Sequence, residues 1–224
     1  MLLRAVPLAL SGLLLALAVS WLVLAQMNFS YGIWHDHAGI GDAIEEYGPT
    51  NLYRHGFHLT TREQRVELFA GINRAIHSGG EGLAELSYTV PGHAPQSLLR
   101  EPEVVHLQDV ANLIDQATYA AVAALIIWLG LVIYYVKAGM PVPEMKAQLI
   151  GVLLFMSVVA VLVIAIGPVK VFYELHELLF PDGHQWFFYY QESLLGKEWP
   201  RKKFPYFFKI TKINFGQFSC RTCL

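Results

Sequence analysis

The chain has 224 residues, of which 54% are hydrophobic and 15% are charged, and its formal net charge is −2. A net charge this close to zero gives no basis for a nucleic-acid partner. The two cysteines, Cys220 and Cys223, stand close together at the end of the sequence and do not define a disulfide framework.

Three long segments lack Asp, Glu, Lys and Arg, roughly 5–34, 117–136 and 147–169. A helix of about 20 apolar residues, rising ~1.5 Å per residue, crosses the hydrocarbon core of a bilayer. We therefore predict an α-helical integral membrane protein with transmembrane helices at residues 5–27, 117–136 and 147–169. The first could also be a cleaved signal peptide, but its apolar stretch exceeds the usual ~7–15 residues, which favours an uncleaved anchor.

Basic residues indicate how the chain is oriented. Arg4 precedes the first apolar segment, and the short loop 137–146 carries Lys137 and Lys146. Because lysine and arginine in short loops mark the cytoplasmic side, we expect the amino terminus and this loop to lie inside. Residues 28–116 and 170–195 are then extracytoplasmic.

The segment 28–116 is too long for a simple loop, and we expect a small α+β domain there. Thr61 and Glu63 have the pattern of a helix start. Apolar residues at helical spacing follow them: Val66, Leu68, Phe69, Ile72 and Ile76. Residues 86–90 alternate as in a short strand. A further helix is expected to begin near Pro102 and to continue into the second span.

A histidine precedes the second span. His106 is flanked at helical spacing by Glu103 and Asp109, so the three side chains are expected to share one face of a helix. Either carboxylate could accept a ring N–H from His106 and so fix its tautomer. Histidines near a membrane surface also occur as purely structural groups, and this spacing alone does not decide between the two interpretations.

A second histidine, His176, follows the third span between Phe172 and Phe180. We expect the third span to continue as a helix past Pro168 to His176, with a kink at the proline. At ~1.5 Å per residue, the two histidines lie roughly 15 and 12 Å beyond their spans. Because a short loop joins spans two and three, we expect these spans to be antiparallel neighbours and the two rings to be able to meet.

The two motifs resemble those of the bacterial lipoprotein intramolecular transacylase (Lit) family of integral membrane proteins. The resemblance is carried by Glu103, His106, Leu107, Asp109 and Val110, then by Phe172, His176 and Phe180, and then by Pro181, Gly183, Trp186, Phe187 and Phe188. The order of the elements also matches, over about residues 1–195.

This resemblance implies an enzyme of the bacterial plasma membrane whose site faces the extracytoplasmic side. Members of the family move the sn-2 acyl chain of a diacylglyceryl-cysteine to the α-amino group of the same cysteine. The motif match makes His106 and His176 the catalytic pair. We expect Phe172, Phe180 and Trp186 to contact the lipid substrate, although such aromatic residues also form belts at membrane interfaces.

The chemistry of this reaction fits the residues. The substrate's own amine, with a pKa near ~7.7–8, is the nucleophile. No enzyme serine or cysteine is then required, and the sequence has no Gly-x-Ser-x-Gly motif. A neutral histidine suits the role of base, which we assign to His106 with His176 as its partner, although the roles could be reversed. No cofactor is expected.

The sequence departs from the family after the tryptophan motif. The family has a fourth span there, whereas residues 196–224 form a basic tail without an apolar run of that length. A phospholipid acyl ester is therefore a possible substrate beside a lipoprotein, and the oligomeric state is open.

Two other functions are compatible with the sequence. A membrane assembly or scaffold protein could have the same fold without catalysis. A metal-binding membrane protein could use His35 and His37, or His55 and His58, because zinc sites commonly contain such pairs. The spacing of Cys220 and Cys223 also occurs in redox and metal motifs.

Overall fold

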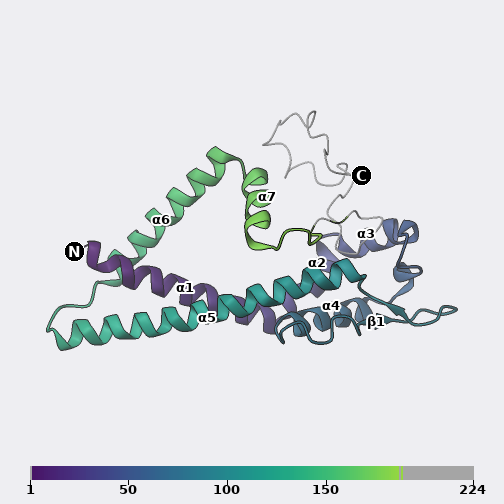
Figure 1. Ribbon diagram of the computed structural model, residues 1–224, viewed down its shortest axis with the longest axis horizontal. Coiled ribbons are helices and arrows are strands. Elements are labelled where there is room, and N and C mark those ends of the chain that lie inside the picture. The colour runs from purple at the N-terminus through teal and green to yellow at the C-terminus, as the bar shows by residue number, and fades with distance from the viewer. Residues whose placement is uncertain (1, 187, 189–224) are drawn as a thin grey trace.

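The computed structural model describes residues 2–186 and residue 188, and most of these residues are helical. Three long helices dominate the molecule (Figure 1): α1 (Leu2–Gln26), α5 (Glu101–Lys137) and α6 (Met145–Ile166). All three are long and apolar enough to cross a membrane. The predicted α-helical fold with three candidate spans is confirmed at this level.

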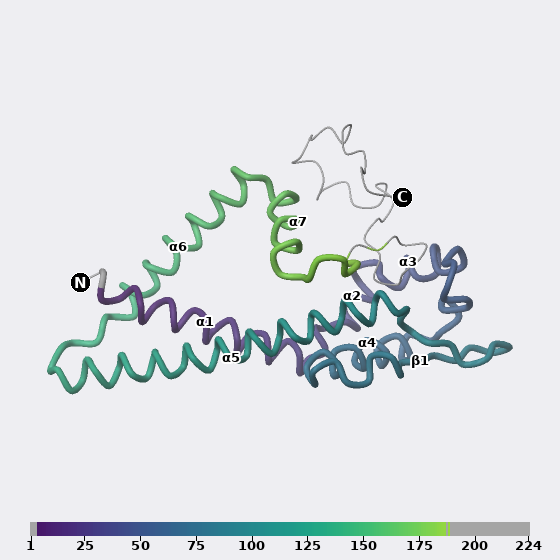
Figure 2. The backbone as a smooth tube through the Cα atoms, in the orientation of Figure 1, coloured from purple at the N-terminus to yellow at the C-terminus, as the bar shows by residue number. Residues whose placement is uncertain are grey.

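The long helices pack in an order that the sequence analysis did not predict. α1 packs against both α5 and α6, while α6 diverges from α5 along its length (Figures 1 and 2). The prediction that spans two and three are neighbours was wrong, because a short loop brings only the ends of two helices together. Ala5, Ala9 and Ser11 are buried on α1, and such small side chains allow helices to approach closely.

Residues 28–100 form a connecting domain between α1 and α5. It contains α2 (Tyr31–His37), α3 (Ile40–Tyr47), α4 (Arg62–Ile76) and three short 3₁₀ turns, Asn28–Ser30, Gly48–Thr50 and Phe57–Leu59. Two short strands, β1 (Ser87–Tyr88) and β2 (Gln96–Ser97), pair antiparallel with Ser87 opposite Ser97 and Tyr88 opposite Gln96.

Local sequence signals explain two of these elements. Thr61 caps α4, since its hydroxyl accepts from the Gln64 N–H while the Gln64 side chain accepts from the Thr61 N–H. The predicted start of this helix is confirmed. The strand predicted at 86–90 is confirmed only over Ser87–Tyr88.

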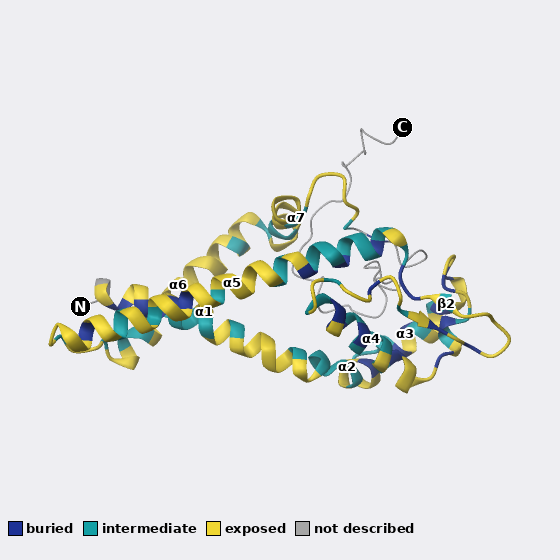
Figure 3. Ribbon diagram, turned by 60° about the horizontal axis from the view of Figure 1, so that its bottom comes forward, coloured by how far each residue is buried: buried dark blue, intermediate teal, exposed yellow. Residues whose placement is uncertain are grey.

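The connecting domain holds the hydrophobic core, while the long helices are mostly exposed along their lengths (Figure 3). The buried core residues come from the turns, the strands, α4 and α5: Phe57, Ala75, Leu83, Tyr88, Val90, Leu98, Leu99 and Leu107. The start of α5 is thus part of the domain. At ~1.5 Å per residue, α5 is roughly 55 Å long, which exceeds a hydrocarbon core of ~30 Å. Its charged first part, up to Gln116, therefore extends beyond the apolar span.

α6 ends at Ile166 and a separate helix, α7 (Pro168–Leu179), follows at once in a new direction (Figure 1). The prediction placed a kink at Pro168, but Gly167 makes the break with φ +99°, a backbone conformation that side-chain-bearing residues rarely adopt. Pro168 then occupies the first turn of α7, where its missing N–H costs no hydrogen bond.

Candidate active site

His106 stands on a helix that is anchored in the connecting domain. Its neighbour Leu107 belongs to the buried core, and Ala111, one turn further along α5, is completely buried. His106 itself is half-buried and its ring lies against Phe180 and Phe188, at 5.0 and 5.9 Å between ring centres. The packing of Leu107 and Ala111 therefore fixes which way His106 faces.

α7 places His176 in a cluster of aromatic rings. The imidazole centre lies 4.0 Å from the ring centre of Phe172, 4.8 Å from that of Trp186 and 5.3 Å from that of Phe180. Phe180 thus contacts both imidazoles, one from α5 and one from α7. All three residues expected to contact a lipid substrate lie around the two histidines.

The hydrogen bond of His176 indicates which of its nitrogens is available. Its Nδ1 lies 2.8 Å from the carbonyl oxygen of Phe172. A carbonyl oxygen can only accept, so Nδ1 carries the proton and donates it in this bond. The opposite nitrogen, Nε2, takes no part in this bond.

The surroundings of His106 favour its neutral form. Burial lowers the pKa of His106 below its ordinary value, the negative charge of Asp109 opposes this shift, and the nearby His176 adds to it. At neutral pH the imidazole is therefore uncharged, which is the form that a general base requires. The effect of His176 on the His106 pKa agrees with the contact that both imidazoles make with Phe180.

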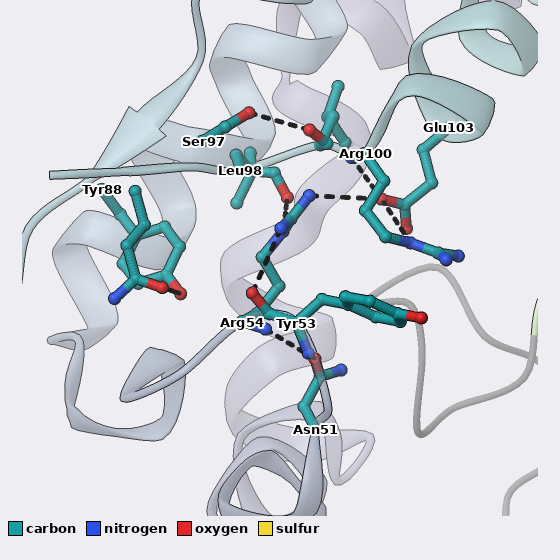
Figure 4. Close-up of polar contacts among 10 residues, drawn as sticks. Asn51, Tyr53, Arg54, Tyr88, Ser97, Leu98, Arg100 and Glu103 are labelled. Atoms are coloured by element: carbon teal, nitrogen blue, oxygen red, sulfur yellow. Dashed lines mark hydrogen bonds and ion pairs between the residues drawn. The ribbon is translucent and has the colours of Figure 1, made fainter.

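Glu103 has partners at the start of α5 and in the connecting domain that the sequence does not predict. Its carboxylate accepts the Arg100 backbone N–H at 2.7 Å, which caps α5. The same oxygen forms ion pairs with Arg100 (3.6 Å to Nε) and with Arg54 (3.8 Å to Nη2), as Figure 4 shows. Glu103 is only 1% exposed. It holds the start of α5 against the turn that carries Arg54.

Arg54 completes this buried cluster. Its Nε donates to the carbonyl oxygen of Leu98 at 2.7 Å, and its backbone N–H donates to the Asn51 side chain at 2.8 Å (Figure 4). Burial lowers the pKa of Arg54, while the charge of Glu103 opposes that shift. The cluster therefore joins the 51–54 turn, the strand end at Leu98 and the first turn of α5.

Asp109 has a partner that the sequence analysis missed. Its Oδ2 lies 2.7 Å from Nδ1 of His184, in the segment that follows α7. Asp109 also acts on His106 through its charge. The pair ties the segment carrying Trp186 and Phe188 to α5.

His35, one of the residues proposed for a metal site, has other contacts. Nδ1 of His35 lies 2.9 Å from Asp36, which also pairs with Arg62 at 2.6 Å, and Arg65 lies 3.3 Å from Nε2 of His35. Within residues 2–186 and 188, no group of three or more His, Cys, Asp or Glu side chains is placed to hold a metal ion. Cys220, Cys223 and the basic tail 196–224 lie outside the described residues.

Two residues near the site escaped the sequence analysis. His184 stands in the turn Pro181–Gly183–His184, whose glycine signals a loop but not its partner on α5. Arg100 lies over the ring of Tyr53 at 5.0 Å and near that of Phe188 at 5.8 Å. Both contacts depend on chain segments that only the folded structure brings together.

Comparison with known proteins supports the resemblance noted in the sequence. Residues 90–200 match the family described as lipoprotein intramolecular transacylase Lit. This segment includes α5, α6, α7 and both histidines. No curated protein and no solved structure matches the chain significantly. On the family match, which covers about half of its length, the chain belongs to the Lit family.

Proposed function

We propose that this protein is a membrane transacylase of the Lit type. It moves the sn-2 acyl chain of a diacylglyceryl-cysteine to the α-amino group of that cysteine. The observation that carries the proposal is the contact of both His106 and His176 with the ring of Phe180, with His106 held neutral by burial. The family match supplies the class of reaction.

In the proposed reaction, neutral His106 accepts a proton from the substrate amine as the nitrogen attacks the sn-2 ester carbonyl carbon. The C–N bond forms, and the C–O bond to glycerol then breaks. Protonated His176 donates from Nε2 to the leaving glycerol oxygen, so the products are an amide and a free hydroxyl. The two histidines return to their starting forms by exchanging protons with solvent.

Two further features suit this reaction. Donor and acceptor belong to one molecule, so the site has only to hold the amine near the ester, and such proximity supplies much of the rate. The rings of Phe172, Phe180 and Trp186 offer apolar walls for acyl chains beside the histidines. With Arg4, Lys137 and Lys146 inside the cell, the site faces the extracytoplasmic side.

The test is mass spectrometry of the amino-terminal lipopeptide of a lipoprotein from cells with and without this protein. We expect the N-acylated lyso form with the wild type and with His93→Ala, a control at an exposed histidine in the connecting domain. We expect the unaltered diacylglyceryl form with His106→Ala or His176→Ala. An unaltered substrate in wild-type cells would overturn the proposal and favour a non-catalytic scaffold.

A further inference from the structure

α7 runs across the direction of α5 instead of along it (Figures 1 and 2). It begins immediately after α6, a helix whose apolar side chains are exposed along its length. α5 is long and apolar enough to cross a membrane, and a helix that lies across such a span lies along the membrane plane. α7 is therefore placed at the edge of the bilayer, where α6 leaves it.

The side chains of α7 divide into three faces. Leu175, Leu178 and Leu179 share one face at helical spacing, and they are 47%, 78% and 49% exposed. The charged residues Lys170, Glu174 and Glu177 form a second face. Phe172 and His176 form a third, which packs against Trp186.

The position of the leucine face indicates that lipid covers it. The three exposed leucines follow directly after α6, whose exposed apolar side chains are covered by lipid in a membrane. A helix with an apolar face and a separate charged face lies in the interface, with the apolar face in the acyl-chain region. The charges on Lys170, Glu174 and Glu177 then remain at the level of headgroups and water.

We propose that α7 is an interfacial helix whose leucine face is embedded in the membrane leaflet next to the connecting domain. The embedded face sets the depth of Phe172 and His176, at the boundary between headgroups and acyl chains where the ester groups of lipids lie. This placement does not depend on which reaction the histidines carry out.

The test uses single cysteines in the full chain, with Cys220→Ser and Cys223→Ser, reconstituted in phosphatidylcholine vesicles. Leu175→Cys reports the leucine face and Glu177→Cys is the matched control on the charged face. Both sites are exposed in the fold, so neither change removes a core contact. Each cysteine is reacted with a charged maleimide that does not enter membranes. In a parallel sample, each cysteine is labelled with a fluorophore, and the vesicles contain lipids that are spin-labelled near the headgroup. Quenching of the fluorescence then reports contact with these lipids.

We expect Leu175→Cys to lose most of its reactivity relative to Glu177→Cys and to have its fluorescence quenched by the spin-labelled lipid. Equal reactivity and no quenching at either site would place α7 in water and overturn the proposal. Protection of Leu175→Cys without quenching would show that a protein surface, such as a second copy, covers the leucines. Protection and quenching of both sites would place the whole helix inside the bilayer, which also contradicts the proposal.

Discussion

The two histidines stand on regions of very different construction. His106 stands on the first part of α5, which is held against the connecting domain by the hydrophobic core and by the buried cluster of Glu103, Arg54 and Arg100. His176 stands on α7, which follows α6 directly and is linked to α5 through aromatic rings and the pair of Asp109 and His184. The half of the candidate site at His106, the anchored half, is thus held by a hydrophobic core. The half at His176, the outlying half, is positioned by a few contacts that the chain makes around the end of α7.

The largest expected effect comes from removing the base in the anchored half. We expect His106→Ala to lower the rate of acyl migration by ~10²–10⁴-fold, the usual contribution of a general base. His106 is only half-buried, so the thermal unfolding temperature in detergent is expected to change little. The rate is measured on a purified diacylglyceryl lipopeptide. A variant that retains full activity would remove His106 from the mechanism.

The anchored half should depend on Glu103 for its stability. Glu103→Ala leaves Arg54 and Arg100 without their shared carboxylate, and breaking a buried ion pair costs ~3–5 kcal/mol. The ion-pair distances of 3.6 and 3.8 Å favour the lower end of this range. Chemical denaturation in detergent measures the loss. Glu101→Ala, at an exposed position one residue into the same helix, is the control and should change the free energy of unfolding little.

The outlying half should depend on Gly167 for its direction. Gly167→Ala places a side chain at φ +99°, at a cost of ~1–3 kcal/mol, and the chain relieves this strain by turning α7. We expect a lower rate of acyl migration with an unchanged connecting domain. Gly151→Ala lies inside α6, where an added Cβ meets nothing within 4 Å, and it should be neutral. Equal activities of the two variants would show that the break at Gly167 does not position His176.

The smallest effect is expected at the contact between the halves. Asp109→Asn removes a partly exposed ion pair worth up to ~1 kcal/mol, so the rate should fall at most several-fold. It also removes the negative charge that opposes the lowering of the His106 pKa. Asp115→Asn, at an exposed position on the same helix, is the control.

The pH dependence sharpens this prediction. Activity requires neutral His106, so the rate falls as the pH drops through the pKa of His106, which lies below its ordinary value of 6.5. In Asp109→Asn that pKa drops further, and the acid limb of the rate profile should move to lower pH. A shift toward higher pH would contradict the assignment of His106 as the base.

The local features of both regions can be predicted from the sequence, but the contacts between distant segments cannot. The start of α4 at Thr61 and the apolar spans follow from capping chemistry and from runs without charges, which are local properties. The packing of α1 between α5 and α6 depends on contacts between distant segments. Likewise, helical spacing predicts that Asp109 lies on the same face of α5 as His106. It does not predict that Asp109 contacts His184, which follows α7 in the chain.

The central claim is that His106 and His176 act as one site assembled from both regions. A double-mutant comparison of His106→Ala, His176→Ala and the double variant tests it most directly, with acyl migration on the purified lipopeptide as the measured rate. Residues that act as a unit are strongly non-additive, so we predict that the double variant is about as slow as either single variant. If the two losses multiply in the double variant, the histidines act independently and the claim is contradicted.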